Sequence, residues 1–569
     1  MSEATDVKYQ LQEYQPNLSV STRENIQNII TGIEQNDKPL YGQALINFVV
    51  KENEQFNIEE LKEHGLRAKL WNSLTKLATG ANDNDLLAIV FTVFRIISRD
   101  KGSVNDLVND EWISLILKNI GLNDNEFNYD EDTLCRIEEG QKVLWNTVFS
   151  SKPLVEASLS NGLLDKLVNR IRLYDSAHIS DVIKFYDVKL LFLLSALSVP
   201  VREKLEKELD GLNVLINVLR VVLKEAAESI AQSPELPAIL DDKKAEVVCE
   251  TLKCMFNITL KCGTDSKSIQ QYNILIGLLR NYLLASTITL ERTWDLRNDI
   301  INLLTNIPAV CYSELMMPVD KSKPLLKSLK FENYNMIVFY EMLMFLEAKF
   351  NDKVALSVTQ QLEVYSPILT VLLKGTTAHR PIRKYLRLHI LPPLKDVDNR
   401  PENTDTLRGK LCKLLTTPIT QIRDLVAELL FVLCKCNVDR MIKYTGYGNA
   451  AGLFAQRGLL GGKKDEDEEN FSSDNEDSET EEYAGQKHLI NPVLGCLDQP
   501  HPDPMEGMSE EQKEYEAMKL VQLMNNLLES RTILPCRVGP DGKPQPIEHV
   551  LQLQEGLKSL QLQSDSDTE

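Results

Sequence analysis

One sequence pattern recurs along the chain and limits the folds that it can form. The segment EGQKVLWN at residues 139–146 returns as ETLKCMFN at 250–257 and, more weakly, as DIINLLTN at 299–306. Each segment has apolar side chains at the spacing of one helix face. Comparable amphipathic helices start at residues 88 and 187, so the five starts lie 48 to 63 residues apart. Armadillo and HEAT repeats have a period of about 40–47 residues. The sequence therefore predicts an all-α, armadillo/HEAT-like α-solenoid with lengthened loops.

A chain of 569 residues is too long for one compact core, and its composition changes along its length. Within the array, helices are expected at residues 42–51, 58–77, 85–99, 112–120 and 137–149, without alternating strands. The predicted parts are a loose N-terminus (1–20), the armadillo-like array (21–462), an acidic phosphorylatable linker (463–503) and a C-terminal helix with a flexible tail (504–569).

The asparagines that close the repeated segments are candidate partner-binding residues. In armadillo arrays the third helix of each repeat lines a concave groove. Asn146, Asn257 and Asn306 would form a polar ladder along such a groove. An asparagine amide can donate and accept, so it can hold the backbone of a guest peptide. The alternative is that each asparagine caps its own helix or bonds a neighbouring repeat.

Two arginines add positive charge near the start of the array. Arg95 and Arg99 are four residues apart and share a helix face. If that face lines the groove, the matching guest is an acidic or carboxylate-ended segment with apolar anchors. The spacing is equally consistent with ion pairs between these arginines and acidic residues inside the array.

A second basic face lies in RPIRKYLRLHILPPL, residues 380–394. Pro381 suits a first helical turn, and Pro392 and Pro393 end the helix. The apolar side chains form one face, suited to a core, and the cations form another. Like charges on one face repel, which favours an anion as partner, although a solvated basic face is the plain alternative. The candidate phosphate-docking residues are Arg380, Arg383, Lys384 and Arg387.

The acidic linker carries candidate phosphorylation sites. Ser473 and Ser478 each have a glutamate three residues on, which is the preference of an acidophilic, casein-kinase-two-type kinase. Thr480 is a weaker candidate, because Tyr483 stands at that position. Each phosphate adds about −1.5 to −2 charge and three acceptor oxygens. Without modification, the segment is a plain solubilising linker.

Residues 509–528 predict a strong helix beyond the linker. Ser509 is a plausible N-cap, Gln512 completes a capping box, and acidic residues fill the first turn. One face is apolar and either binds a partner or packs back on the array. Its apolar residues are Met518, Val521, Leu523, Met524, Leu527 and Leu528.

Charge and motif content exclude several classes of function. The net charge of −20 argues against nucleic acid or anionic membrane as the main partner. The longest apolar run is shorter than the roughly 20 residues that span a bilayer. Ten cysteines without a CxxC pair indicate reduced thiols and a cytoplasmic monomer. No metal-binding, cofactor-binding or catalytic pattern is found, and the spacing of Gly446, Gly448 and Gly452 does not fit a nucleotide loop.

Several long segments resemble one known family. The segment MIKYTGYGNAAGLFAQRGL at residues 441–459 is similar to the hallmark of synembryns, the resistance-to-inhibitors-of-cholinesterase proteins. Segments at 94–100, 186–194, 383–394 and 504–513 agree, so the resemblance runs from about residue 90 to about 530. It implies a chaperone and guanine-nucleotide exchange factor for G-protein α subunits, GDP-bound or nucleotide-free. In that family the α subunit's C-terminal helix enters the groove and GDP leaves.

The resemblance also implies roles for particular residues. Arg95, Arg99 and Asn146 would contact the guest helix or its terminal carboxylate. The phosphorylated linker would dock on the face of Arg380, Arg383 and Lys384, and the helix at 509–528 would contact the nucleotide domain. Recruitment to the cell cortex or plasma membrane stays open. The rival interpretation is a generic armadillo adaptor or scaffold that binds acidic peptides.

Overall fold

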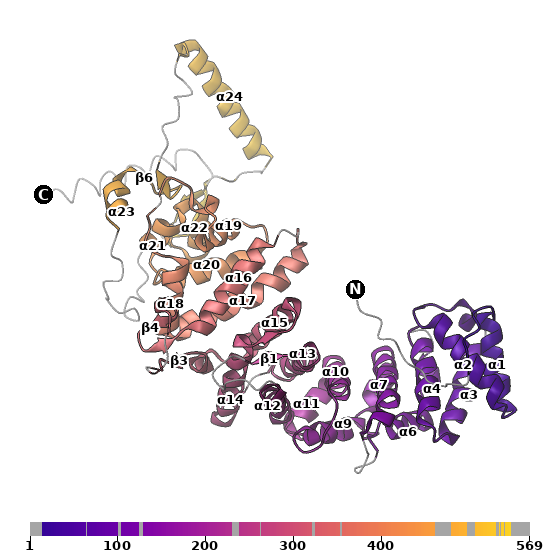
Figure 1. The fold of residues 1–569 in the computed structure, drawn as a ribbon. Coiled ribbons are helices and arrows are strands. Elements are labelled where there is room, and N and C mark those ends of the chain that lie inside the picture. The colour runs from indigo at the N-terminus through magenta and orange to yellow at the C-terminus, as the bar shows by residue number, and fades with distance from the viewer. Residues whose placement is uncertain are drawn as a thin grey trace. The chain divides into compact units, whose positions relative to one another are not determined.

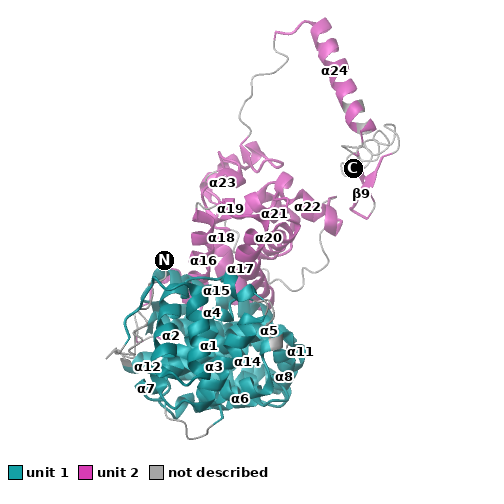
Figure 2. Cartoon of the chain, turned by 90° about the vertical axis from the view of Figure 1, so that its right-hand side faces the viewer, with its two compact units in different colours: residues 1–315 teal, residues 316–569 magenta. Residues whose placement is uncertain are grey.

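The fold is described from a computed structural model of the chain. The structure describes residues 14–497 and 507–547, apart from residues 64, 101–103, 124–128, 230–237, 262, 321, 323–324, 353–354, 396, 461–479, 531–533, 535 and 540. The chain divides into two compact units, Met1–Leu315 and Met316–Glu569, which Figure 2 shows in teal and magenta.

Unit 1 is almost entirely helical within the described residues. Its only strands there, β1 (Ile239–Leu240) and β2 (Ser286–Thr287), form a short parallel pair. Its helices are α1 (Thr22–Glu34), α2 (Lys38–Glu52), η1 (Glu59–Lys62), α3 (Leu66–Gly80), α4 (Asn84–Ile97), α5 (Val104–Leu107), α6 (Asp110–Asn119), α7 (Glu131–Ser150), α8 (Lys152–Ala157), α9 (Leu163–Arg172), η2 (Leu173–Asp175), α10 (Asp181–Leu197), α11 (Val199–Lys207), α12 (Gly211–Ser229), α13 (Asp242–Ile258), α14 (Ser266–Leu284), α15 (Leu290–Asn306) and η3 (Ala309–Leu315).

The helices of unit 1 form two layers. In the first, α4, α7, α10, α13 and α15 pack side by side in chain order, as Figure 1 shows. In the second, α3, α6, α9, α12 and α14 each pack on the first-layer helix that follows it. The repeated sequence segments lie on first-layer helices, so the predicted all-α, armadillo/HEAT-like α-solenoid class is confirmed. We call the first layer the ladder layer.

Side-chain caps explain where most ladder-layer helices begin. Asp83, Asp130, Ser180 and Asp241 precede α4, α7, α10 and α13, and each accepts a hydrogen bond from a backbone N–H of the first turn. Such caps satisfy donors that have no partner within the helix. The helix expected at residues 58–77 is instead split, because Gly65 has a left-handed φ of 78° and α3 begins only after it.

A buried polar network ties three helices of unit 1 together. Asp187 on α10 accepts from Arg170 Nε on α9 at 2.8 Å, and its side chain is only 1% exposed. Gln141 on α7 donates to the same carboxylate at 2.7 Å, and Tyr174 donates at 3.0 Å. A buried carboxylate is tolerated only when it is fully paired, so these donors fix α7, α9 and α10 against one another.

Unit 2 has helices and several two- or three-residue strands, which the sequence did not predict. Strand β5 pairs antiparallel with both β3 and β4, and β6–β7 and β8–β9 form hairpins. The elements are β3 (Met317–Pro318), η4 (Lys327–Leu329), β4 (Lys330–Phe331), β5 (Tyr334–Asn335), α16 (Ile337–Asn351), α17 (Val358–Ala378), α18 (Arg380–Ile390), η5 (Pro401–Asn403), α19 (Leu407–Leu414), α20 (Thr420–Leu433), α21 (Val438–Thr445), α22 (Tyr447–Arg457), α23 (Glu481–Gln486), η7 (Lys487–Leu489), β6 (Ile490–Asn491), β7 (Cys496–Leu497), α24 (Glu510–Glu529), β8 (Cys536–Val538) and β9 (Pro544–Pro546).

The glycine-rich segment between α21 and α22 packs against the hairpin β6–β7. Gly446 has a φ of 76°, and a Cβ built there would meet the Leu494 backbone at 3.0 Å. Backbone N–H groups of Tyr447 and Gly448 donate to the carbonyls of Pro492 and Val493 at 2.9 and 3.0 Å. The glycines thus allow a close approach of two backbones within unit 2. Among the described residues, no helix is both long and apolar enough to span a membrane.

The buried network yields a stability prediction. Asp187→Ala would leave the Arg170 guanidinium buried without its carboxylate, so we expect a loss of about 3–5 kcal/mol in the free energy of unfolding. Urea titration followed by circular dichroism measures it. Glu156→Ala, which removes an ion pair with side chains 88% and 68% exposed, is the control and should cost at most about 1 kcal/mol. Equal losses in the two variants would contradict a structural role for Asp187.

Candidate functional site

The predicted residues Arg95 and Asn146 lie together where α4 meets α7. Arg95 Nε donates to Glu139 Oε2 at 2.7 Å, and Arg95 Nη2 donates to Asn53 Oδ1 at 2.7 Å. Lys142 Nζ approaches the other oxygen of Glu139 at 2.8 Å. Burial alone would raise the pKa of Glu139, but Lys142 and Arg95 more than offset it, and the pKa is lowered. Arg95 is therefore held in place by an ionised carboxylate.

Arg99 has hydrogen-bond partners of a different kind from those of Arg95. Its Nη1 donates to the backbone carbonyls of Asn53 and Gln55, and its guanidinium carbon lies 5.1 Å from the centre of the Phe56 ring. No carboxylate lies within 4.0 Å of it in the part of the chain that the structure describes. Burial and the neighbouring Arg95 lower the pKa of Arg99, while Glu139 and Glu54 act on it in the opposite direction. A half-buried cation that meets only neutral acceptors is suited to receive an anion.

The three predicted asparagines share one geometry. Each Nδ2 donates to a carbonyl near the end of the preceding partner helix and to a hydroxyl three residues further on. For Asn146 these are Arg95 O at 3.3 Å and Ser98 Oγ at 3.0 Å. Asn257 bonds Phe192 O and Ser195 Oγ, and Asn306 bonds Phe256 O and Thr259 Oγ1.

This arrangement matches the alternative that each asparagine bonds a neighbouring repeat. The bonds fix α7 on α4, α13 on α10 and α15 on α13. Because the three Nδ2 atoms are used within the chain, a guest backbone would meet these side chains through their amide oxygens. Clamping of a guest by Asn146, Asn257 and Asn306 stays a prediction.

Sequence reasoning missed an aromatic cluster on the same layer. Trp145 and Phe149 of α7 stack with ring centres 5.6 Å apart. Lys189 of α10 lies 4.9 Å from the Trp145 ring centre and 4.8 Å from that of Phe185. These side chains are half-buried or exposed. The available signal was the aromatic residue directly before the asparagine in two of the repeated segments, Trp145 and Phe256.

In unit 2, the expected buried apolar face of α18 is confirmed. The helix spans Arg380–Ile390, and its apolar side chains, including Ile382 and Tyr385, are buried. Arg380 pairs with Glu332 at 3.0 Å, and Arg383 Nη1 donates to Thr376 O at 3.0 Å. Arg387 departs from the expected exposed face, because its side chain is buried. Lys384 is half-buried and also has an interaction within the chain.

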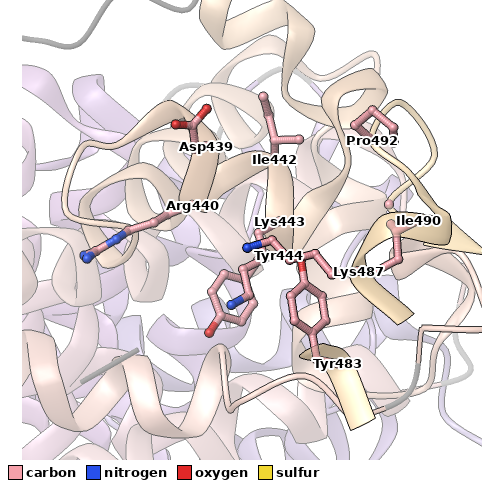
Figure 3. A pocket seen from close by; sticks show the side chains of 10 residues that line it. Asp439, Arg440, Ile442, Lys443, Tyr444, Tyr483, Lys487, Ile490 and Pro492 are labelled. Carbon is pink, nitrogen blue, oxygen red and sulfur yellow. The ribbon is translucent and has the colours of Figure 1, made fainter. Parts of the chain in front are cut away.

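Cations of α21 and η7 lie around a cavity in unit 2. Arg440, Lys443 and Lys487 line a cavity of about 400 Å³ with two tyrosines (Figure 3). Lys443 Nζ lies 4.4 Å above the Tyr483 ring centre. Burial raises the pKa of Cys434 to about 12, although Arg387 of α18 and Arg440 of α21 both act on it in the opposite direction. The two helices thus bring their cations to one region of unit 2.

The predicted phosphorylation sites Ser473 and Ser478 lie outside the described residues. Thr480 is described and caps α23, where its hydroxyl accepts from Tyr483 N at 3.2 Å. The same hydroxyl donates to Leu394 O, four residues beyond the end of α18. The chain that follows the acidic run is therefore anchored beside the basic helix.

The expected C-terminal helix is present as α24, with the predicted capping box. Ser509 N donates to Gln512 Oε1 at 3.1 Å, and Gln512 N donates to Ser509 Oγ at 3.3 Å. Its described apolar side chains, among them Met518, Val521 and Leu523, are exposed. The side chains of Met524 and Leu528 lie outside the described set.

Two stacked helix layers with a cationic, aromatic-lined region define a helical-repeat protein of the kind that binds other proteins. The model of the family described as guanine nucleotide exchange factor synembryn matches residues 90–543. The chain belongs to this family, as the resemblance of its segments implied.

Curated relatives agree with this assignment. Chaperone Ric-8A of Xenopus tropicalis is 36% identical over 554 residues, which cover 95% of this chain and 99% of that protein. Chaperone Ric-8 of Drosophila melanogaster is also 36% identical, over 88% of this chain and 93% of its own length. A chain in the crystal complex of SYS-1 and POP-1 is similar at 14% identity with a TM-score of 0.46, covering 75% of this chain and 67% of that one.

The lowered pKa of Glu139 predicts how stability depends on pH. As the pH falls, Glu139 is protonated in the unfolded chain before it is protonated in the folded chain. The stabilisation is therefore complete above the ordinary glutamate pKa of about 4.3 and is lost as the pH falls through the lower pKa of the folded state. Glu139→Gln should therefore lower the free energy of unfolding by about 1–3 kcal/mol at neutral pH. In urea titrations the difference should shrink below about pH 4. A difference that stays constant down to about pH 3 would contradict the ion-pair assignment.

Proposed function

We propose that the chain chaperones G-protein α subunits and promotes GDP release from them as a guanine-nucleotide exchange factor. Family membership supports this activity. The proposed binding site is argued from the contacts of Arg99. Its guanidinium is half-buried, donates hydrogen bonds to neutral carbonyls and lies against one aromatic ring. The proposed guest element is the C-terminal helix of the α subunit, whose last carboxylate meets this arginine.

The charges at the end of α4 favour such a guest. Glu139 is already bonded to both Arg95 and Lys142, and the hydrogen bonds of Arg99 go to neutral carbonyls. A guest carboxylate would form a charge-assisted hydrogen bond there, which is roughly twice as strong as a neutral one. The aromatic side chains of α7 and α10, including Trp145 and Phe185, offer contact area for apolar residues of the same helix.

Exchange follows if the chain binds one state of the α subunit better than another. Capture of the C-terminal helix stabilises the nucleotide-free state relative to the GDP-bound state, so GDP leaves. By linkage, nucleotide rebinding weakens the complex. The exposed apolar side chains of α24, such as Met518 and Val521, are proposed to contact the nucleotide domain. No covalent chemistry is required.

We also propose that phosphorylation of the acidic linker by a casein-kinase-two-type enzyme regulates this activity. Thr480 lies only two residues after Ser478 and is bonded to Leu394 O. Two residues of extended chain span at most about 7 Å. A phosphate on Ser478 would therefore be tethered near Leu394 and near Lys443, which lies over the Tyr483 ring. We propose that it forms charge-assisted bonds to Lys443 or to the cations of α18, Arg383 among them. The protein would act as a cytoplasmic monomer that α subunits recruit to the membrane.

The activity is tested by GDP release from a purified α subunit. The chain should accelerate release, and Arg99→Ala should reduce the apparent affinity about 10- to 100-fold, since it removes a charge-assisted bond of about 1.5–3 kcal/mol. Arg23→Ala, which removes an exposed ion pair in the same unit, is the matched control and should behave like the wild type. No acceleration by the wild type would favour a generic adaptor. Equal activity of the two variants would place the carboxylate site elsewhere.

Phosphate docking predicts that Arg383→Glu abolishes the gain in activity that follows phosphorylation. Repulsion replaces attraction, so phosphorylated and unphosphorylated variants should release GDP at the same rate. Arg380→Glu, at a more exposed side chain (43%), should act in the same direction with less effect on folding. Arg423→Glu on α20 is the control, and thermal midpoints verify folding. A full gain in both α18 variants would overturn the docking proposal.

A further inference from the structure

We propose that the cavity between α3, α5 and α6 of unit 1 binds a small carboxylic acid, whose oxygens accept hydrogen bonds from the indole N–H groups of Trp71 and Trp112. The cavity has a volume of about 420 Å³, which is within the usual range for sites that hold small molecules. This site is separate from the end of α4 where the proposed guest helix binds, and it does not depend on the proposed function.

The two tryptophans are held in place by their own helices. Trp71 lies on α3, where its carbonyl accepts from the Thr75 hydroxyl one turn later at 2.9 Å. Trp112 lies in the first turn of α6, where its backbone N–H donates to the side chain of the N-cap Asn109 at 2.8 Å. All four residues line the cavity. The local structure of α3 and α6 therefore brings both indoles to one place.

Neither indole N–H has a hydrogen-bond partner in the described part of the chain. The side chains of Trp71 and Trp112 are each only 1% exposed, and both Nε1 atoms are buried without an acceptor. A buried donor without an acceptor is destabilising, and native proteins contain few of them. Here two such donors belong to side chains that line the same cavity. An oxygen atom of a ligand would supply the acceptor that the fold does not.

The aromatic neighbours do not replace that acceptor. The rings of Trp71 and Trp112 are 5.3 Å apart and inclined by 36°. Because an indole N–H bond lies in the plane of its ring, rings this close to parallel do not direct the N–H of one at the face of the other. Phe94 is steeply inclined to both, by 71° and 74°. A contact between an N–H and an aromatic face is much weaker than a bond to an oxygen.

Charge favours an anionic ligand over a neutral or cationic one. Lys76 lines the cavity, is exposed, and has no ion pair or hydrogen bond with the residues that the structure describes. Glu111 also lines it, but Glu111 and Thr79 are shared with a neighbouring cavity of about 640 Å³, so Glu111 stands where the two cavities adjoin. Ionised acceptors form the stronger hydrogen bonds. A carboxylate therefore satisfies both indoles and Lys76, whereas an amine offers them no acceptor.

Nuclear magnetic resonance of the full-length chain tests the site directly. Labelling with ¹⁵N-tryptophan gives one indole N–H signal for each of the four tryptophans. Trp145→Phe and Trp294→Phe identify the two signals from outside the cavity, so the two tryptophans of the cavity need no substitution. The probe is sodium benzoate at constant ionic strength. Both signals of the cavity should move downfield with one Kd of about 1–10 mM, as expected for a ligand of about nine non-hydrogen atoms. The signals of Trp145 and Trp294 should stay in place.

Matched probes and variants then test the chemistry of recognition. Benzamide has the same shape without the charge and should bind at least about threefold more weakly, and benzylamine should move neither signal. Lys76→Met should weaken benzoate binding at least about fivefold, because it removes the cation. Lys69→Met is the control, since Lys69 is equally exposed on α3 but lies outside the cavity, and it should leave the Kd unchanged.

Three results would overturn the inference. The first is that neither cavity signal moves with benzoate. The second is that benzamide or benzylamine binds as tightly as benzoate, because the site would then not select a carboxylate. The third is that Lys76→Met and Lys69→Met bind benzoate equally well. None of these results bears on GDP release, so the proposed function would stand unchanged.

Discussion

The Glu139 carboxylate is the interaction on which the proposed site depends. It is almost fully buried, and a buried carboxylate without partners would cost several kcal/mol. Thr92, Arg95 and Lys142 all donate to it, which fixes α7 against α4 and orients Arg95. Arg99, two residues beyond the end of α4, donates its hydrogen bonds to neutral carbonyls. A structural ion pair inside the ladder layer thus lies next to the cation that we propose binds the guest.

The same layer shows how rigidity and binding are combined. Asparagine bonds to helix ends recur along unit 1. In each, the hydroxyl that accepts from the asparagine donates in turn to a carbonyl three residues earlier in its own helix. These bonds set the distance between neighbouring helices, while aromatic side chains such as Trp145 remain at the surface. A rigid layer loses little conformational freedom when a guest binds, so more of the contact energy appears as affinity.

The sequence predicted the helical repeats because periodicity depends only on which residues are apolar. It also predicted α18 with its buried face, since Pro381 in its first turn and Pro392 and Pro393 after its end define that helix locally. It could not show that Asn257 donates to Ser195 or that Phe56 lies on Arg99, because such contacts join residues more than 40 positions apart. The serine or threonine that receives each asparagine has no pattern of its own. The hairpin that packs on the glycines near residue 446 lies about 45 residues later and was not foreseen.

Hydrogen–deuterium exchange of the full chain, with and without a nucleotide-free G-protein α subunit, tests the location of the site most directly. If the guest binds where α2, α4 and α7 meet, amides in peptides that cover residues 53–56, 95–99 and 145–149 should exchange more slowly in the complex. Slower exchange restricted to other parts of the chain, with these peptides unchanged, would contradict the account.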